Sequence, residues 1–196
     1  MDYANYLTAM GRFDESIEIG KQAVAIDPLS PVAYNELGWA LRNAGRDEAA
    51  LEQYRKGLEL NPDFPQSHWA LSDLYLKKGM YNEAAAESQK HMSLVSQNDD
   101  SLAFVGYTFG RTGRRAEALA ILNEWKKRAK NQEVSAASLA VIYIGLGQRE
   151  PALDLLERAY QGRDVRLVWL KVASYYDPLR GDPRFQDLLR RMNFPP

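Results

Sequence analysis

Histidine, serine and acidic side chains are the residues of this sequence that could carry catalysis or hold a metal. The two histidines, His68 and His91, lie 23 residues apart, and neither has a third metal ligand at a useful spacing. Ser135 and Ser138 have no histidine or lysine base at helical spacing that could activate them. The acidic pair at 99–100 begins a predicted helix, where acidic side chains are stabilised by the helix dipole. We therefore predict that the chain is not an enzyme and binds no cofactor or metal.

The composition of the chain further limits the class of protein and the partners that we expect. Hydrophobic residues make up 45% of the 196 residues, which suffices for a core, and no apolar run reaches the length of a membrane span. The formal net charge of −1 gives no overall basic surface for nucleic acid. The chain has no cysteine, which excludes disulfides and thiol catalysis, and its first residues do not form a secretion signal. We expect a cytoplasmic protein that contacts neither membrane nor nucleic acid.

The elements that must position any site are organised by a regular spacing of glycine. Glycine recurs every 34 residues, at Gly11, Gly45, Gly79, Gly113, Gly147 and Gly181. A period of this length is typical of stacked helix–turn–helix units. Glycine between two helices suits a position with positive φ, so we expect each of these residues to end a first helix.

The residues around each glycine repeat as well. Large apolar residues stand eight and four positions before it, as in Leu37 and Leu41, and would form one buried stripe on the first helix. Small residues stand seven before and five after it: Ala4, Gly38, Ser72, Gly106 and Ala140, then Ser16, Ala50, Ala84, Ala118 and Ala152. These small residues predict a close approach of the two helices in each pair.

This pattern resembles the tetratricopeptide repeat family. The family's aromatic, Leu-Gly pair, Tyr, Ala, aromatic, Ala and Pro appear as Tyr34, Leu37-Gly38, Leu41, Ala50, Tyr54, Gly57 and Pro62. His91 and Trp125 depart from it, because they stand where the family prefers alanine. The resemblance implies an all-α fold, a right-handed α-solenoid of helix–turn–helix repeats with a C-terminal capping helix.

The expected organisation follows the glycine period. The segments are a truncated first repeat (1–30), four repeats (31–64, 65–98, 99–132 and 133–166), and a degenerate repeat with the capping helix (167–196). Since the first segment holds only the later part of a first helix, we expect the chain to start within a longer protein. The alternative is a genuine short first helix, whose exposed inner face would favour self-association.

The end of the chain has its own pattern. We expect a short helix over 165–172, a stop at Asp177-Pro178, and a closing helix over Pro183–Met192 capped by Asp182. The stretch Asp177–Pro195 resembles the closing segment of bacterial tetratricopeptide arrays. In such arrays a winged-helix, kinase or nucleotide-cyclase domain commonly precedes the repeats. The resemblance therefore implies a bacterial regulatory protein.

A second stripe runs along each first helix, opposite the buried one. It lies thirteen, ten, six and three positions before each glycine, and in the family it lines the concave groove. The predicted peptide-binding groove comprises Asn35, Trp39, Arg42, Asn43, Trp69, Asp73, Lys77, Tyr107 and Arg111. Aromatic residues and arginine are enriched at binding hot spots. The alternative is that Trp39 and Trp69 only pack between neighbouring first helices.

The family's best-known groove binds C-terminal carboxylates through lysine and asparagine. Asn35 matches one such position, but the slots for the lysine hold Trp69, Ala103 and Ala137. An extended peptide with apolar or aromatic side chains fits this groove better. We expect a non-catalytic module with a protein or peptide partner. The alternatives are a self-assembling regulatory domain, which would form a homo-oligomer, and a glycosyltransferase-type accessory array.

The fourth complete copy carries apolar residues on both faces of its first helix. Its groove-side stripe is Val134, Ala137, Val141 and Ile144. A helix that is apolar all round is normally buried, so something must cover this second face. The two candidates are the tail Ser174–Arg184 and another chain, and we expect the tail because Tyr175, Tyr176 and Leu179 lie close in sequence.

Overall fold

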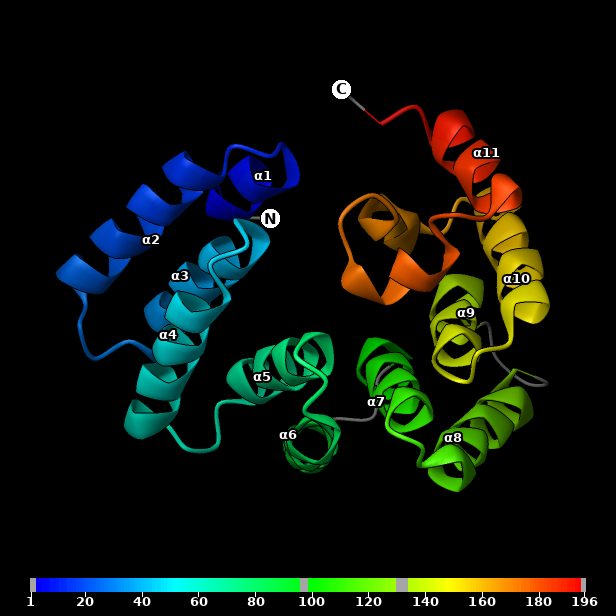
Figure 1. The fold of residues 1–196 in the computed structure, drawn as a ribbon, viewed down its shortest axis with the longest axis horizontal. Coiled ribbons are helices and arrows are strands. Elements are labelled where there is room, and N and C mark those ends of the chain that lie inside the picture. The colour runs from blue at the N-terminus through cyan, green and yellow to red at the C-terminus, as the bar shows by residue number, and fades with distance from the viewer. Residues whose placement is uncertain (1–2, 96–98, 130–133, 195–196) are drawn as a thin grey trace. The chain divides into compact units, whose positions relative to one another are not determined.

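The computed structural model describes residues 3–95, 99–129 and 134–194, and all regular secondary structure in these ranges is helical. The chain divides into two compact units, Met1–Leu94 and Val95–Pro196 (Figure 1). Each unit contains several antiparallel helix pairs of the kind that the glycine period predicts. The boundaries of the individual repeats stay a prediction.

Unit 1 is built from three successive helix pairs. Its helices are α1 (Tyr3–Ala9), α2 (Phe13–Ile26), α3 (Pro31–Asn43), α4 (Asp47–Leu60), α5 (Pro65–Lys77) and α6 (Tyr81–Leu94). α3 packs against α2, α4 and α5, so the middle pair has neighbours on both sides (Figure 1). Its core includes Leu37, Leu41 and Leu71, which are the large apolar positions of the predicted stripe.

The periodic glycines end the first helices as predicted. Five of them, Gly11 to Gly147, have φ between 72° and 80°. At Gly45 the glycine N–H donates to the Arg42 carbonyl (3.0 Å) and the Arg46 N–H donates to the Leu41 carbonyl (2.9 Å). These two bonds satisfy carbonyls that the helix end would leave without partners. Gly181 differs, because its φ is not positive and it follows a 3-10 turn rather than an α-helix.

Small residues bring the two helices of a pair into close contact. A Cβ at position 38 would lie 2.5 Å from Cε1 of Tyr54, so only glycine leaves room for this ring. The Tyr54 side chain is completely buried, and burial raises the pKa of its hydroxyl well above the usual value. In the next pair the Ser72 hydroxyl donates to the Ala84 carbonyl at 2.8 Å. The predicted close approach is therefore present.

Unit 2 begins with two helix pairs and ends in an irregular tail. The pairs are α7 (Asp99–Arg111) with α8 (Arg115–Arg128), and α9 (Ala136–Gly145) with α10 (Arg149–Gln161). The backbones of α7 and α9 nearly touch, since a Cβ at Gly145 would lie 2.5 Å from Cα of Tyr107. This contact needs glycine because the obstacle is backbone, which cannot rotate away as a side chain can.

The tail departs in detail from the prediction. In place of one short α-helix it forms two 3-10 helices, η1 (Val165–Trp169) and η2 (Ser174–Leu179). Pro178 lies inside η2 rather than ending a helix. Proline has no N–H to extend an α-helix, whereas a short 3-10 turn accommodates it. The closing helix α11 (Pro183–Met192) is present, and the Asp182 side chain accepts from the Arg184 N–H at 2.9 Å.

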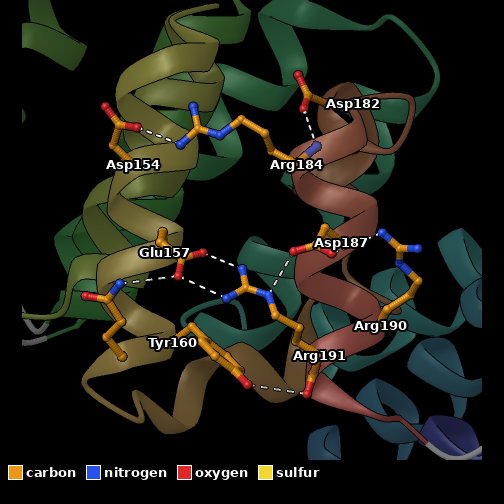
Figure 2. A network of polar contacts seen from close by, with 9 residues as sticks. Asp154, Glu157, Tyr160, Asp182, Arg184, Asp187, Arg190 and Arg191 are labelled. Carbon is orange, nitrogen blue, oxygen red and sulfur yellow. Dashed lines mark hydrogen bonds and ion pairs between the residues drawn. The ribbon is translucent and has the colours of Figure 1, made fainter.

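Ion pairs hold α11 against α10 (Figure 2). Arg184 binds Glu150 (3.1 Å) and Asp154 (2.7 Å), while Arg191 binds both carboxylate oxygens of Glu157. Below them, α11 buries Phe185 and Leu188. Arg191 holds the pKa of the Glu157 carboxyl below its usual value. Arg184 and Arg191 therefore link the capping helix to the preceding pair, whereas Arg190 pairs with Asp187 inside α11.

Replacing Gly38 with leucine should destabilise the fold. The added side chain would overlap the buried Tyr54 ring, and overpacking of this kind costs about 1–3 kcal/mol of the free energy of unfolding. Urea denaturation followed by circular dichroism measures it. Gly181→Ala is the control, because a Cβ there meets nothing within 4 Å and φ is ordinary. Equal midpoints for Gly38→Leu and the parent would contradict the close-packed slot.

The ion pair between Glu157 and Arg191 should make stability depend on pH. Because the pKa of Glu157 is lowered from its usual 4.5, the pair stabilises the fold above that pH and stops doing so as pH falls through the folded-state pKa. The thermal midpoint of Glu157→Gln should lie below that of the parent at neutral pH and approach it in acid. Glu52→Gln is the control, since Glu52 pairs with Lys56 inside a single helix. A pH-independent difference would argue against the pair.

Candidate functional site

The two histidines have structural roles. His68 lies 2.5 Å from Glu87 through Nδ1 and 2.8 Å from the Pro62 carbonyl through Nε2. His91 is 2.9 Å from the Pro65 carbonyl, and burial lowers the pKa of its imidazole. Within the described ranges, no three histidine, aspartate or glutamate side chains are grouped so that they could hold a metal ion.

The serine and aspartate candidates of unit 2 stabilise helix ends. Ser135 caps α9, because its hydroxyl accepts from the Ser138 N–H (3.0 Å) and donates to Asp164 (2.6 Å). Burial raises the pKa of Asp164, but hydrogen bonds from Ser135 and two backbone N–H groups outweigh it and leave that pKa lowered. The Ser138 hydroxyl donates to Asp100 at 3.2 Å, in the first turn of α7. The hydrogen bonds of Ser135, Ser138 and Asp164 therefore hold helix ends in place.

Two tryptophans form the centre of the candidate surface in unit 1. Trp39 lies on α3 and Trp69 on α5, and their rings stack with centroids 5.6 Å apart and planes 29° from parallel. Both rings are half-buried, so each packs on its neighbour and still keeps some exposed surface. The two interpretations of these tryptophans, packing and binding, are thus compatible.

A buried ion pair lies beside the rings. Arg42 and Asp73 are only 8% and 6% exposed and bind each other through Nη2 and Oδ2. The Arg42 guanidinium carbon also lies 5.3 Å from the Trp39 ring centroid. Removing one partner of a buried pair leaves an uncompensated charge and typically costs about 3–5 kcal/mol. We name Trp39, Trp69, Arg42 and Asp73 the tryptophan cluster.

The other predicted groove residues of unit 1 surround this cluster. The Asn35 amide donates to the Ser67 hydroxyl at 3.3 Å, and the Asn43 amide donates to the Trp39 carbonyl at 2.8 Å. Lys77 is exposed but pairs with Asp47 of α4 at 2.7 Å. Polar contacts therefore link α3, α4 and α5 around the rings.

The last two predicted residues belong to unit 2. Tyr107 is only 5% exposed, and Arg111 places its guanidinium carbon 5.9 Å from the Tyr107 ring centroid. Tyr175 of η2 meets the same ring edge-on, with centroids 6.2 Å apart and planes at 65°. Among the aromatic residues of the predicted groove, Trp39 and Trp69 in unit 1 therefore keep some exposed surface, whereas Tyr107 in unit 2 is buried beside an exposed Arg111.

The tail is what covers the apolar face of α9, as predicted. η1 and η2 contact α9 (orange beside the yellow-green helix in Figure 1), and Ala137, Val141 and Ile144 are buried. Arg166 adds an ion pair with Asp100 of α7. Sequence reasoning missed that the tail also reaches α7. The signals in the sequence were two tail residues: Tyr175, an aromatic like Tyr107, and Arg166, whose charge is opposite to that of Asp100.

Comparison with known proteins agrees with this geometry. A family model described as TPR repeat matches residues 40–79, and one described as Tetratricopeptide repeat matches 20–52. Small glutamine-rich tetratricopeptide repeat-containing protein 2 of Mycosarcoma maydis is 38% identical over 97 residues, which cover 50% of this chain and 24% of that protein. The peroxisomal targeting signal receptor of Candida glabrata is 25% identical over 158 residues, or 80% of this chain and 25% of the receptor. The chain thus spans about a quarter of the length of these relatives.

Solved structures show the same fold. The crystal structure of TTC0263, a thermophilic TPR protein in Thermus thermophilus, superposes with a TM-score of 0.65 at 20% identity, covering 88% of this chain and 94% of that one. The family models thus match tetratricopeptide repeats within residues 20–79, and this neighbour confirms the all-α solenoid fold. The bacterial regulatory context stays a prediction.

In the part of the chain that the structure describes, no helix is long and apolar enough to cross a membrane.

Ending the chain at Lys171 should destabilise unit 2. It removes η2 and α11, and with them the fully buried Leu179 and Phe185, which leaves the apolar face of α9 exposed. We expect a lower thermal midpoint or new aggregation, measured by calorimetry and light scattering. A chain ending at Met192, which keeps α11, is the control. A monomer as stable as the parent would show that the tail covers nothing.

Proposed function

We propose that this tetratricopeptide array is a non-catalytic module that binds a peptide or protein segment in the groove lined by the first helices of its repeats. The observation that carries the proposal is the stacked pair Trp39–Trp69. These rings come from successive first helices and keep part of their surface exposed. Tryptophan and arginine are the residue types most enriched at binding hot spots.

The surroundings of the rings support this role. The Asn43 amide is bound to the Trp39 carbonyl, and Arg42, bound to Asp73, lies close to the Trp39 ring. Side chains that are already ordered lose little conformational entropy when a ligand binds. The half-buried rings would therefore present a preorganised surface rather than one that must form on binding.

The relatives support the same class of function. One of them is named a targeting signal receptor, and it matches 80% of this chain. For the present chain we propose only a protein or peptide partner, because the chain spans about a quarter of that receptor. The cytoplasmic location, the regulatory context and the absence of nucleic-acid contact stay predictions.

Self-association is the second candidate, and one observation favours it. Tyr3 and Tyr6 of α1 stack on each other at 6.3 Å, yet they are 60% and 47% exposed. An exposed aromatic pair at one end of unit 1 is a surface that a second copy could cover. Sedimentation of the parent and of Tyr6→Ser separates the candidates: a dimer that Tyr6→Ser abolishes favours assembly, and a monomer at every concentration excludes it.

Trp69→Ala should weaken ligand binding. Peptides selected from a random displayed library against the parent protein serve as ligands, and their affinity is measured by calorimetry. If Trp69 is a hot spot, the loss is about 2 kcal/mol or more, or roughly thirtyfold in Kd. Tyr81→Ala is the matched control, since Tyr81 is an exposed aromatic on a second helix. The proposal fails if the selected peptides bind both variants and the parent equally.

A further inference from the structure

The position six residues before the periodic glycine carries an aromatic ring in both units, and its contacts in unit 2 indicate what the tryptophan cluster of unit 1 binds. Trp39 stands six residues before Gly45, and Tyr107 stands six residues before Gly113. Each ring has a guanidinium beside it, from Arg42 at 5.3 Å and from Arg111 at 5.9 Å. The two aromatic rings are therefore equivalent parts of two repeats.

In unit 2 the chain fills this position itself. Tyr175 and Tyr107 form a T-shaped pair, and Tyr107 is almost completely buried. Tyr175 is held by Tyr176 at 4.7 Å, and Tyr176 by Phe185 at 5.9 Å, so the tail presents it from a fixed support. Edge-to-face packing is a preferred geometry of aromatic pairs because the positive ring edge meets the negative face.

In unit 1 the equivalent ring remains partly exposed. Trp39 stacks on Trp69 but is only half-buried, whereas Tyr107 is 5% exposed. Trp69 stacks on the Trp39 indole and Arg42 lies over it, so the surface left for a further aromatic ring is the exposed part of the Trp39–Trp69 stack.

The charged residues around Trp39 indicate which net charge a bound peptide segment should have. Arg42 and Asp73 bind each other in a buried pair, and Lys77 binds Asp47. The positive charges of Arg42 and Lys77 are thus each balanced by a carboxylate of the protein. An acidic ligand would have to compete with Asp73 or Asp47, whereas an uncharged one leaves both pairs in place.

From these observations we infer that the tryptophan cluster accepts a tyrosine-like aromatic side chain, packed against the exposed part of the Trp39–Trp69 stack, from a segment of a partner that carries no net charge. The inference rests on the proposed function and specifies its ligand. It assigns the aromatic ring, rather than a terminal carboxylate, as the group recognised in unit 1.

The test uses the full chain labelled with 5-fluorotryptophan and observed by fluorine NMR. Trp39→Phe, Trp69→Phe and Trp169→Phe variants assign three of the four tryptophan signals, and the remaining signal belongs to Trp125. The probe is a peptide with both ends blocked and the sequence of residues 172–180, VASYYDPLR, which has no net charge. One control peptide replaces both of its tyrosines with alanine. The other is VASAADDDD with a free C-terminal carboxylate.

We expect the tyrosine peptide to shift the Trp39 and Trp69 signals in a saturable way and the alanine peptide to bind at least tenfold more weakly. The Trp125 signal should not move, because that side chain is fully buried. Trp169 lies in η1, so a shift of its signal alone would mean that the peptide only replaces the tail in unit 2 and would overturn the inference.

The remaining outcomes separate the inference from the proposed function. If the acidic peptide shifts Trp39 and Trp69 and the tyrosine peptide does not, the inference is wrong and peptide binding stands. The same holds if library-selected peptides depend on Trp69 while the tyrosine peptide leaves both signals unchanged. If neither the library peptides nor the probes affect these rings, both proposals fail.

Discussion

The close approach of paired helices is the constraint on which the structure depends. Gly38 lies directly against the ring of Tyr54, and Gly145 lies against the backbone of Tyr107. A single helix pair cannot bury its apolar face, so it gains stability only when its helices fit tightly and neighbours cover the rest. Small residues at fixed positions make this fit possible. Larger side chains there would separate the helices that carry the candidate surface.

The exposed and the buried ion pairs of this chain have different roles. The pairs that join α11 to α10 are largely exposed, so each is worth little and they act mainly as a group above buried Phe185 and Leu188. The pair of Arg42 and Asp73 is buried, and losing one partner would be far more costly than losing an exposed pair. The first set positions the capping helix, whereas the second fixes the charge of the surface around Trp39.

The two units show two states of one kind of surface. In unit 2 the tail brings Tyr175 onto Tyr107, and the apolar face of α9 is buried beneath η1 and η2. In unit 1 the stacked rings of Trp39 and Trp69 stay half-buried. The covered surface therefore serves the stability of its own unit, while the exposed one is where we propose that a partner binds.

The sequence by itself determined the helix pairs, the glycine that ends each first helix and the small residues between paired helices, because all of these repeat at short, regular distances along the chain. It also predicted the helix that Asp182 caps and the covering of α9 by the tail. Only the tertiary structure decided that Arg42 pairs with Asp73 and that Tyr175 covers Tyr107. These partners lie 31 and 68 residues apart. The tail also breaks the repeat, so no periodic position could predict its 3-10 turns or which rings they would meet.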